Sequence, residues 1–208
     1  MPSTLFHAAV GGLLAAALLP EGFDRRVLAV VALAVLVPEV DVFIGLWVEG
    51  AHRAYTNNVF VPLALAGLVH YDTAVRPRSW LRARWGADAR RVAGVGVVVL
   101  AVAGIGLDLV YNGVNLFFPV VDRFYTLDGK VLLSNQRGLV QTVVDLKEAT
   151  GGTTETQQYW TGVDPQPSNP GTDPADVERV FPLAESGTQI LLIVAGFAVV
   201  AYRLWRDE

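Results

Sequence analysis

Apolar residues in this chain come in long blocks bounded by charged residues, and this pattern restricts the possible fold more than any other feature. The main blocks are residues 27–37, 59–69, 92–107 and 190–200. A water-soluble domain spreads its apolar residues periodically along amphipathic elements instead. Together with their flanks, the blocks approach the roughly 20 residues that a helix needs to cross the hydrocarbon layer of a membrane. With 52% apolar residues and a mean hydropathy of +0.41, the chain is predicted to be a mainly α-helical, polytopic membrane bundle.

The pattern predicts about five transmembrane helices. The first, residues 5–19, is short. Because residues 1–6 contain no lysine or arginine, we interpret it as a retained helix and not as a cleaved signal peptide. The second helix runs from about residue 25 to residue 48 and contains Pro38, which a membrane helix tolerates where neighbours satisfy the freed carbonyl. The other predicted helices are residues 59–75, 92–111 and 187–205.

Arginine residues set the predicted orientation. They concentrate in the loop 76–91, which the positive-inside rule places in the cytoplasm. The turn 49–58 and the segment 112–186 then fall outside, whereas the C-terminus, with Arg203 and Arg206, falls inside. The expectation is a multi-pass protein of the cell membrane with its N-terminus outside and its C-terminus in the cytoplasm.

The predicted regions are transmembrane helices 1–4 over residues 1–111, an extracytoplasmic lobe over residues 112–186 and a C-terminal transmembrane helix over residues 187–208. Inside the lobe, residues 123–144 are expected to form β-hairpin structure that turns at Asp128-Gly129, a favoured hairpin dipeptide. Residues 148–174 are rich in Gly, Thr, Gln, Pro and Asp, which predicts a loop or a flexible segment.

Charge and cysteine content exclude several function classes. A net charge of −4, with no basic tract outside one loop, argues against nucleic-acid binding. The absence of cysteine excludes disulfide scaffolds and thiolate metal sites. Of the 16 basic residues only Lys130 and Lys147 are lysine, and with the acidic outer segment this gives the archaeal-like composition of a GC-rich, salt-loving source. The oligomeric state is not predicted.

A few polar residues stand at the ends of the apolar blocks, all on the outer side in the predicted topology. They are His7, Glu39, Asp41, His52, Asn57 and Asp108. An ionisable residue at membrane depth is costly, so each marks a functional site by default. Imidazole and carboxylate together suit zinc, manganese or iron, whereas an asparagine oxygen suits hard cations better. His70 lies near the cytoplasmic end of its helix and is excluded from the group.

Two of these positions have open interpretations. Glu39 and Asp41 diverge by about 200° in an unbroken helix, so both reach one site only if the helix loosens at Pro38. The alternative is a pair at the membrane edge that faces water. Arg53 is expected either to bind an anion such as phosphate or to extend toward lipid headgroups.

Short motifs follow one another in order over residues 1–125. They are His7, then Pro38-Glu39-Val40-Asp41, His52-Arg53-Ala54-Tyr55-Thr56-Asn57, Asp108 and Gly113-Val114-Asn115-Leu116 with Phe118-Pro119. This series resembles that of the membrane-bound metal-dependent hydrolases, a family of small multi-helix inner-membrane proteins. The chain departs from the family pattern at three positions: Asn57 and Gly104 stand where the family has histidine, and Glu39 where it has aspartate.

The resemblance implies a divalent metal (zinc, manganese or magnesium) with a defined set of ligands. The implied ligands are His7, Asp41, His52 and Asp108, with Asn57 as a further candidate. It also implies Glu39 as a further ligand or general base, and Arg53 as the residue that orients an anionic or lipid-like substrate such as a phosphoester. In this hypothesis the metal activates water for hydrolysis at the outer membrane interface.

Two other functions stay open at this point. A non-catalytic membrane scaffold or sensor, whose outer lobe binds a partner, is favoured by the two missing imidazoles. A transporter is disfavoured because the acidic residues gather toward one end of the helices and not at the bilayer centre. The chain is therefore a metal-dependent hydrolase if it is an enzyme, and the sequence leaves that choice open.

Overall fold

The computed structural model describes residues 3–127, 129–141, 146–148, 152–168 and 174–207. The chain forms two compact units. The helical unit comprises Pro2–Glu39, Val59–Ile105 and Pro182–Glu208, and the loop unit comprises Val40–Asn58 and Gly106–Phe181. The end of the second helix and the turn after it belong to the loop unit.

The described residues are mainly helical, as predicted. The helices are α1 (Thr4–Leu18), α2 (Arg25–Gly45), α3 (Phe60–His70), α4 (Trp80–Trp85), α5 (Ala89–Val99), α6 (Leu107–Tyr111) and α7 (Gly187–Asp207). Two π-helical segments, η1 (Tyr71–Val75) and η2 (Leu100–Gly106), continue α3 and α5. Serine residues begin α1 and α4, since Ser3 and Ser79 each accept a hydrogen bond from a backbone N–H of the first turn.

Three helices are long and apolar enough to cross a membrane. They are Arg25–Gly45, Ala89–Tyr111 and Gly187–Arg206. Thr4–Leu18 and Phe60–Val75 are apolar but shorter. The 15 residues of α1 rise only about 22 Å, against a hydrocarbon layer of about 30 Å. Among the described residues, three helices of spanning length therefore stand where the sequence pattern predicted five.

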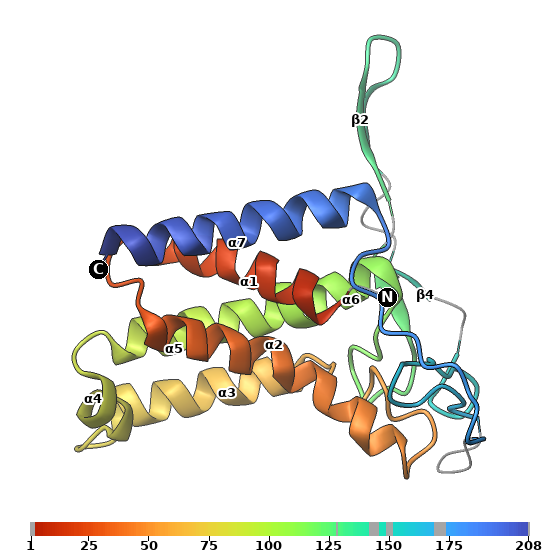
Figure 1. The fold of residues 1–208 in the computed structure, drawn as a ribbon, viewed down its shortest axis with the longest axis horizontal. Helices are drawn as coiled ribbons and strands as arrows, with labels where there is room; N and C mark the ends of the chain where they lie inside the picture. Colours follow the sequence, from red (N-terminus) through yellow and green to blue (C-terminus); the bar gives the residue numbers. More distant parts are fainter. Residues whose placement is uncertain (1–2, 128, 142–145, 149–151, 169–173, 208) are drawn as a thin grey trace. The chain divides into compact units, whose positions relative to one another are not determined.

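Small residues allow close helix packing in the helical unit. Helix α1 lies beside α7, and α3 lies beside α5 (Figure 1). A Cβ atom added at Gly196 of α7 would lie 2.7 Å from the carbonyl oxygen of Ala9 in α1. A Cβ atom at Gly12 would lie 2.6 Å from a methyl group of Val200. Glycine at these positions lets the two backbones approach as small-residue pairs do in membrane helices.

The strands of the loop unit pair differently from the prediction. β1 (Tyr125–Leu127) pairs antiparallel with β4 (Leu146–Glu148), and β2 (Val131–Ser134) pairs antiparallel with β3 (Gly138–Gln141). The hairpin turn therefore lies at residues 135–137 and not at Asp128-Gly129, of which Asp128 lies outside the described residues. The Ser134 hydroxyl accepts hydrogen bonds from the backbone N–H groups of Gln136 and Arg137, and Gly138 supplies a φ of +66°.

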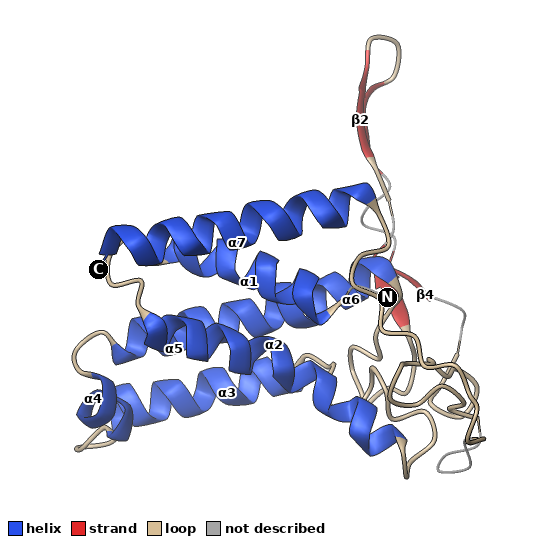
Figure 2. Cartoon of the chain, viewed as in Figure 1, coloured by secondary structure: helices blue, strands red, loops and turns tan. Residues whose placement is uncertain are grey.

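Side-chain hydrogen bonds hold the loops of the loop unit together. Most of the described chain between α6 and α7 is loop (Figure 2). Asp122 accepts hydrogen bonds from the amide of Asn115 at 2.6 Å and from the hydroxyl of Thr154 at 2.6 Å. Gly50, at a φ of +70°, lies so close to Thr154 that an added Cβ atom would stand 1.8 Å from the Thr154 carbonyl oxygen. The segment predicted to be flexible is thus tied to the rest of the unit.

Candidate functional site

Asp41 is the centre of a buried polar cluster in the loop unit. It lies in the last turns of α2 and its side chain has no exposed surface. One carboxylate oxygen lies 3.0 Å from Nδ1 of His52. The other accepts hydrogen bonds from the backbone N–H of Arg53 at 2.8 Å and from the side-chain amide of Asn57 at 3.2 Å. Asp41 therefore organises the turn that follows α2 through three donors.

A left-handed residue shapes this turn. Arg53 has a φ of +66°, the only positive φ of a non-glycine residue among the described positions. Such a conformation is uncommon for a side chain as large as arginine, so surrounding contacts must hold it. Those contacts are the Arg53 N–H bonded to Asp41 and the Arg53 carbonyl, which accepts a hydrogen bond from the backbone N–H of Asn115 at 2.8 Å. The strained turn joins two distant segments of sequence.

The Arg53 side chain is surrounded by acceptors. It is only 1% exposed. Its guanidinium lies 3.3 Å from a carboxylate oxygen of Asp108 and donates to the Gly113 carbonyl at 3.3 Å. With the Asn112 amide oriented to satisfy its neighbours, the amide oxygen accepts from Arg53 at 3.2 Å. The sequence offered two interpretations for Arg53, anion binding and extension toward headgroups. In the structure its anion is Asp108 of the same unit.

Tyr159 closes this cluster, and sequence reasoning missed it. Its ring lies 4.7 Å from the Arg53 guanidinium carbon, a cation–π geometry, and its hydroxyl donates to the Asn112 carbonyl at 3.0 Å. Burial raises the pKa of the Tyr159 phenol, with the Arg53 charge opposing that rise and the Asp108 charge adding to it. Nothing in the local sequence marks Tyr159, because it sits in a Gly-, Thr- and Gln-rich stretch that reads as a loop.

The His52 imidazole is held in one tautomer. Because its Nδ1 faces the Asp41 carboxylate, that nitrogen carries the proton and Nε2 carries the lone pair. The Nε2 atom is buried and has no hydrogen-bond partner in the described part of the chain. The edge of the ring faces Tyr159, with the ring centroids 6.1 Å apart. A buried nitrogen of this kind calls for an explanation such as a water molecule or an ion.

His7 and Glu39, two further predicted site residues, belong to the helical unit. His7 is buried in α1, and its Nδ1 lies 2.7 Å from the Ala103 carbonyl in η2, which assigns the lone pair to Nε2 here too. Glu39 is half-buried and accepts a hydrogen bond from the Thr4 hydroxyl at 3.4 Å. Helix α2 continues through Pro38 to Gly45, so the two carboxylates of the motif project from different sides of the helix.

Gly104, which stands where the metal-dependent hydrolases have a histidine, has no room for a side chain. A Cβ atom added there would lie 2.9 Å from the Cγ atom of Pro38. Real Cβ contacts are not this short, so even an alanine requires the proline ring to shift. The ring of the Pro-Glu-Val-Asp motif therefore occupies the space that an imidazole would need.

The arrangement changes the roles that the resemblance implied for the ligands. In the described part of the chain, no three histidine, aspartate or glutamate side chains gather closely enough to hold one metal ion. Asp41 orients His52, and Asp108 faces Arg53. Asn57 donates to Asp41. The nitrogen that best fits a metal is His52 Nε2, since metal-binding histidines almost always donate their other N–H to a carboxylate or a carbonyl.

No family model, no curated protein and no solved structure matches this chain. The resemblance to the metal-dependent hydrolases therefore rests on the motifs themselves. Five of those motif residues come together in the loop unit: Asp41, His52, Arg53, Asn57 and Asp108.

Proposed function

We propose that this chain is an integral membrane protein that binds a divalent metal at His52 and uses it for hydrolysis, as the metal-dependent hydrolases do. The observation that carries the proposal is the buried Nε2 lone pair of His52, which Asp41 orients through Nδ1. Carboxylate, imidazole and metal in series is a recurring arrangement of metal sites. A divalent metal held at this nitrogen would supply a Lewis acid that activates water for hydrolysis.

The membrane arrangement is part of the proposal. The three long apolar helices support insertion in the membrane. We extend this to five crossings, with the two shorter apolar helices matching the bilayer by local thinning. The arginine-rich loop then lies in the cytoplasm, and the Asp41 cluster faces the outer membrane interface. A phosphoester or another lipid-like substrate would meet the site at headgroup level.

The residues of the cluster take distinct roles in this proposal. Asp41 sets the tautomer and the ring orientation of His52. Arg53 is already neutralised by Asp108, so it positions the turn and does not offer a free charge to a substrate. Glu39, which stands outside the loop unit, stays a predicted general base, as His7 stays a predicted ligand. Both roles are open to direct mutational tests.

Metal analysis of the detergent-purified protein tests this proposal. We expect about one tightly held divalent ion per chain, with zinc or manganese retained better than magnesium at an imidazole. His52→Gln replaces the imidazole by a neutral amide, whose oxygen is a weaker ligand for zinc or manganese, so it should lower the metal content at least tenfold. His70→Ala removes a histidine outside the cluster and should leave the metal content unchanged.

Folding must be measured beside metal content. The helical circular dichroism signal of His52→Gln should match that of the wild-type chain, so that metal loss is not secondary to unfolding. Absence of any divalent ion from gently purified wild-type protein would sink the metal proposal. Metal that stays bound in His52→Gln would place the site elsewhere.

A non-catalytic scaffold is a second candidate, and one observation favours it. The terminal nitrogens of Arg53 face Asp108 and the Gly113 carbonyl and its guanidinium lies over the Tyr159 ring, as expected of a cluster that only stabilises a fold. In that case hydrolysis of phosphoester lipids in mixed micelles should be absent with zinc, manganese or magnesium. Metal-dependent hydrolysis that disappears in His52→Gln but not in His70→Ala would exclude the scaffold.

A further inference from the structure

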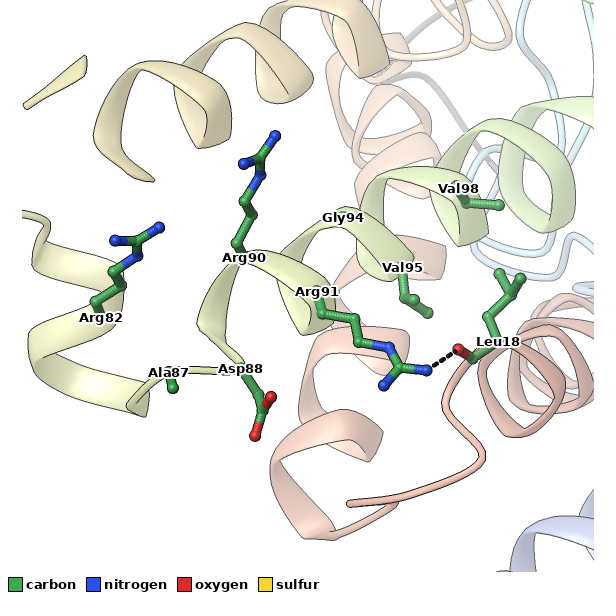
Figure 3. Close-up of a pocket in the computed structure, with 9 residues that line it drawn as sticks. All are labelled: Leu18, Arg82, Ala87, Asp88, Arg90, Arg91, Gly94, Val95 and Val98. Carbon is green, nitrogen blue, oxygen red and sulfur yellow. Dashed lines mark hydrogen bonds between the residues drawn. The ribbon is translucent and has the colours of Figure 1, made fainter. Parts of the chain in front are cut away.

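A pocket in the helical unit carries arginine on one side and apolar side chains on the other. Its volume is about 620 Å³. The residues that line it come from the end of α1, from α4, from the turn before α5 and from α5 itself; they are Leu18, Arg82, Ala87, Asp88, Arg90, Arg91, Gly94, Val95 and Val98 (Figure 3). The pocket lies at the N-terminal end of Ala89–Tyr111, a helix long enough to span a membrane, and so at the boundary between the bilayer and water.

The charge of the pocket is positive. Three arginines and one aspartate line it, which gives a net charge of +2. Arg82, Arg90 and Arg91 are exposed, and in the described part of the chain no carboxylate lies within ion-pair distance of Arg82 or Arg90. Only Arg91 is engaged, since it donates to the Leu18 carbonyl at 3.2 Å. Two guanidinium groups therefore remain available for an anion.

The apolar side of the pocket continues down the helix. Val95 is buried, whereas Leu18 is 42% exposed and Val98 is 41% exposed. Arg90 and Arg91 precede these valines on α5, so that charged and then apolar side chains follow one another along one helix (Figure 3). A ligand that matches this order has an anionic head and an apolar tail.

Helix α4 holds Arg82 in place through a carboxylate outside the pocket. Asp72 accepts hydrogen bonds from the backbone N–H groups of Trp80 and Leu81, both at 3.0 Å, and so anchors the first turn of α4. It also binds the guanidinium of Arg76 at 3.0 Å. Asp72 therefore neutralises Arg76, which lies outside the pocket, and leaves the pocket arginines unpaired with it.

We propose that this pocket binds one anionic phospholipid, with the phosphate between Arg82 and Arg90 and an acyl chain along Leu18 and Val98. The inference rests on membrane insertion but not on the metal site. Each guanidinium near an anionic lipid surface adds to the binding free energy of an anionic lipid. Two together predict roughly 30-fold selectivity for an anionic over a zwitterionic headgroup. The selectivity should be specific to these two arginines and not to the loop as a whole.

Native mass spectrometry of the chain released from nanodiscs tests this lipid site. Nanodiscs contain phosphatidylglycerol and phosphatidylcholine in equal amounts, and the retained lipid is counted. The wild-type chain should keep phosphatidylglycerol in preference to phosphatidylcholine. The double variant Arg82→Gln/Arg90→Gln should lose most of that preference, whereas Arg78→Gln/Arg84→Gln, which removes the same charge from the same loop outside the pocket, should keep it.

Each other outcome overturns the proposal. Equal loss in both double variants would mean a diffuse charge effect, and equal retention of the two lipids would mean an apolar groove without headgroup recognition. Thermal stabilisation of the detergent-purified chain by inorganic phosphate alone, abolished in the pocket variant, would identify a soluble anion as the ligand. Carbonate extraction shows whether each variant is inserted, and metal content reports on His52 separately.

Discussion

The two units of this molecule each bury an arginine, and they satisfy it in different ways. Arg203 of α7 is 8% exposed and donates to the carbonyls of Ala16 and Leu19, both at 2.8 Å, and of Pro20 at 2.9 Å. Arg53 of the loop unit is 1% exposed and faces the carboxylate of Asp108. Among the contacts that the structure describes, Arg203 donates to backbone carbonyls, whereas Arg53 faces a carboxylate.

The difference follows from what each arginine meets. The end of a helix leaves carbonyl groups without intrahelical partners and carries a partial negative charge, so the carbonyls at the end of α1 are good acceptors for Arg203. A loop offers no such array, and a buried guanidinium there needs a carboxylate. In the loop unit Asp108 faces the Arg53 guanidinium, and Asp41 orients the neighbouring His52 ring. The buried charge of the helical unit joins two helices, whereas the loop unit also holds an oriented histidine nitrogen, His52 Nε2, that can bind a ligand.

Among the changes that test this comparison, removal of Asp41 should have the largest effect on the stability of the protein. Asp41→Ala leaves the His52 Nδ1, the Arg53 N–H and the Asn57 amide without their shared acceptor, which should destabilise the protein by about 3–5 kcal/mol. The measurement is the unfolding midpoint in detergent. Asp24→Ala at the exposed start of the same helix removes a cap and an exposed ion pair with Arg26, and should cost about 1 kcal/mol. Equal effects of the two variants would show that the buried cluster is not a centre of stability.

Substitution of the two arginines tests the comparison itself. Arg53→Gln leaves the Asp108 carboxylate without its guanidinium and should cost about 3 kcal/mol. Arg203→Gln removes hydrogen bonds to backbone carbonyls, one of which glutamine can still reach, and should cost about 1–2 kcal/mol. Denaturant titration of both variants measures the difference. The reverse order would mean that the helix-end carbonyls need their cation more than Asp108 does.

Glycine substitutions in the helical unit test whether lack of space, and not the chemistry of the side chain, limits position 104. Gly104→Ala brings a Cβ atom against the Pro38 ring, and the forced shift should cost about 1–3 kcal/mol. Gly67→Ala in α3, where no atom lies within 4 Å of the new Cβ atom, should be neutral or slightly stabilising. Gly104→His should not increase metal content, because Pro38 fills the position. An additional metal ion in Gly104→His would contradict this account of the family difference.

The smallest expected effect concerns pH. The pKa of Tyr159 lies above its ordinary value of 10.0 because of burial, so the folded chain holds this proton more tightly than the unfolded chain does. The resulting stability is fully present below pH 10.0 and decreases as pH rises through the folded pKa. Comparison of the ultraviolet phenolate titrations of wild-type and Tyr159→Phe protein isolates this group. A Tyr159 signal that ionises at or below the ordinary value would contradict the burial argument.

Tyr159→Phe should also cost about 1 kcal/mol through the lost hydrogen bond to the Asn112 carbonyl. The ring stays over Arg53, so the cation–π contact is kept. Tyr125→Phe, a substitution at another half-buried tyrosine of the loop unit, serves as the control for loss of a phenol.

Sequence periodicity was sufficient for the helices and insufficient for the strand pairing. Blocks of apolar residues predict α1, α2, α3 with η1, α5 with η2 and α6, and α7 within a few residues, because helix formation in such blocks depends on local composition. The hairpin turn was predicted wrongly at Asp128-Gly129. Asp-Gly is a favoured hairpin dipeptide, but β1 pairs with β4 and not with the strand that follows it in sequence. The strength of a turn signal is local, whereas the choice of a strand partner is not.

The sequence by itself determined which residues are chemically notable, since a carboxylate, a histidine or an arginine beside an apolar block is visible without any structure. Only the tertiary structure decided what each one does. It placed Asp108 against Arg53, brought Tyr159 from a remote loop to the same guanidinium, and filled the space at Gly104 with Pro38. Those pairings join positions far apart along the chain, and the burial that makes them necessary exists only after the chain has folded.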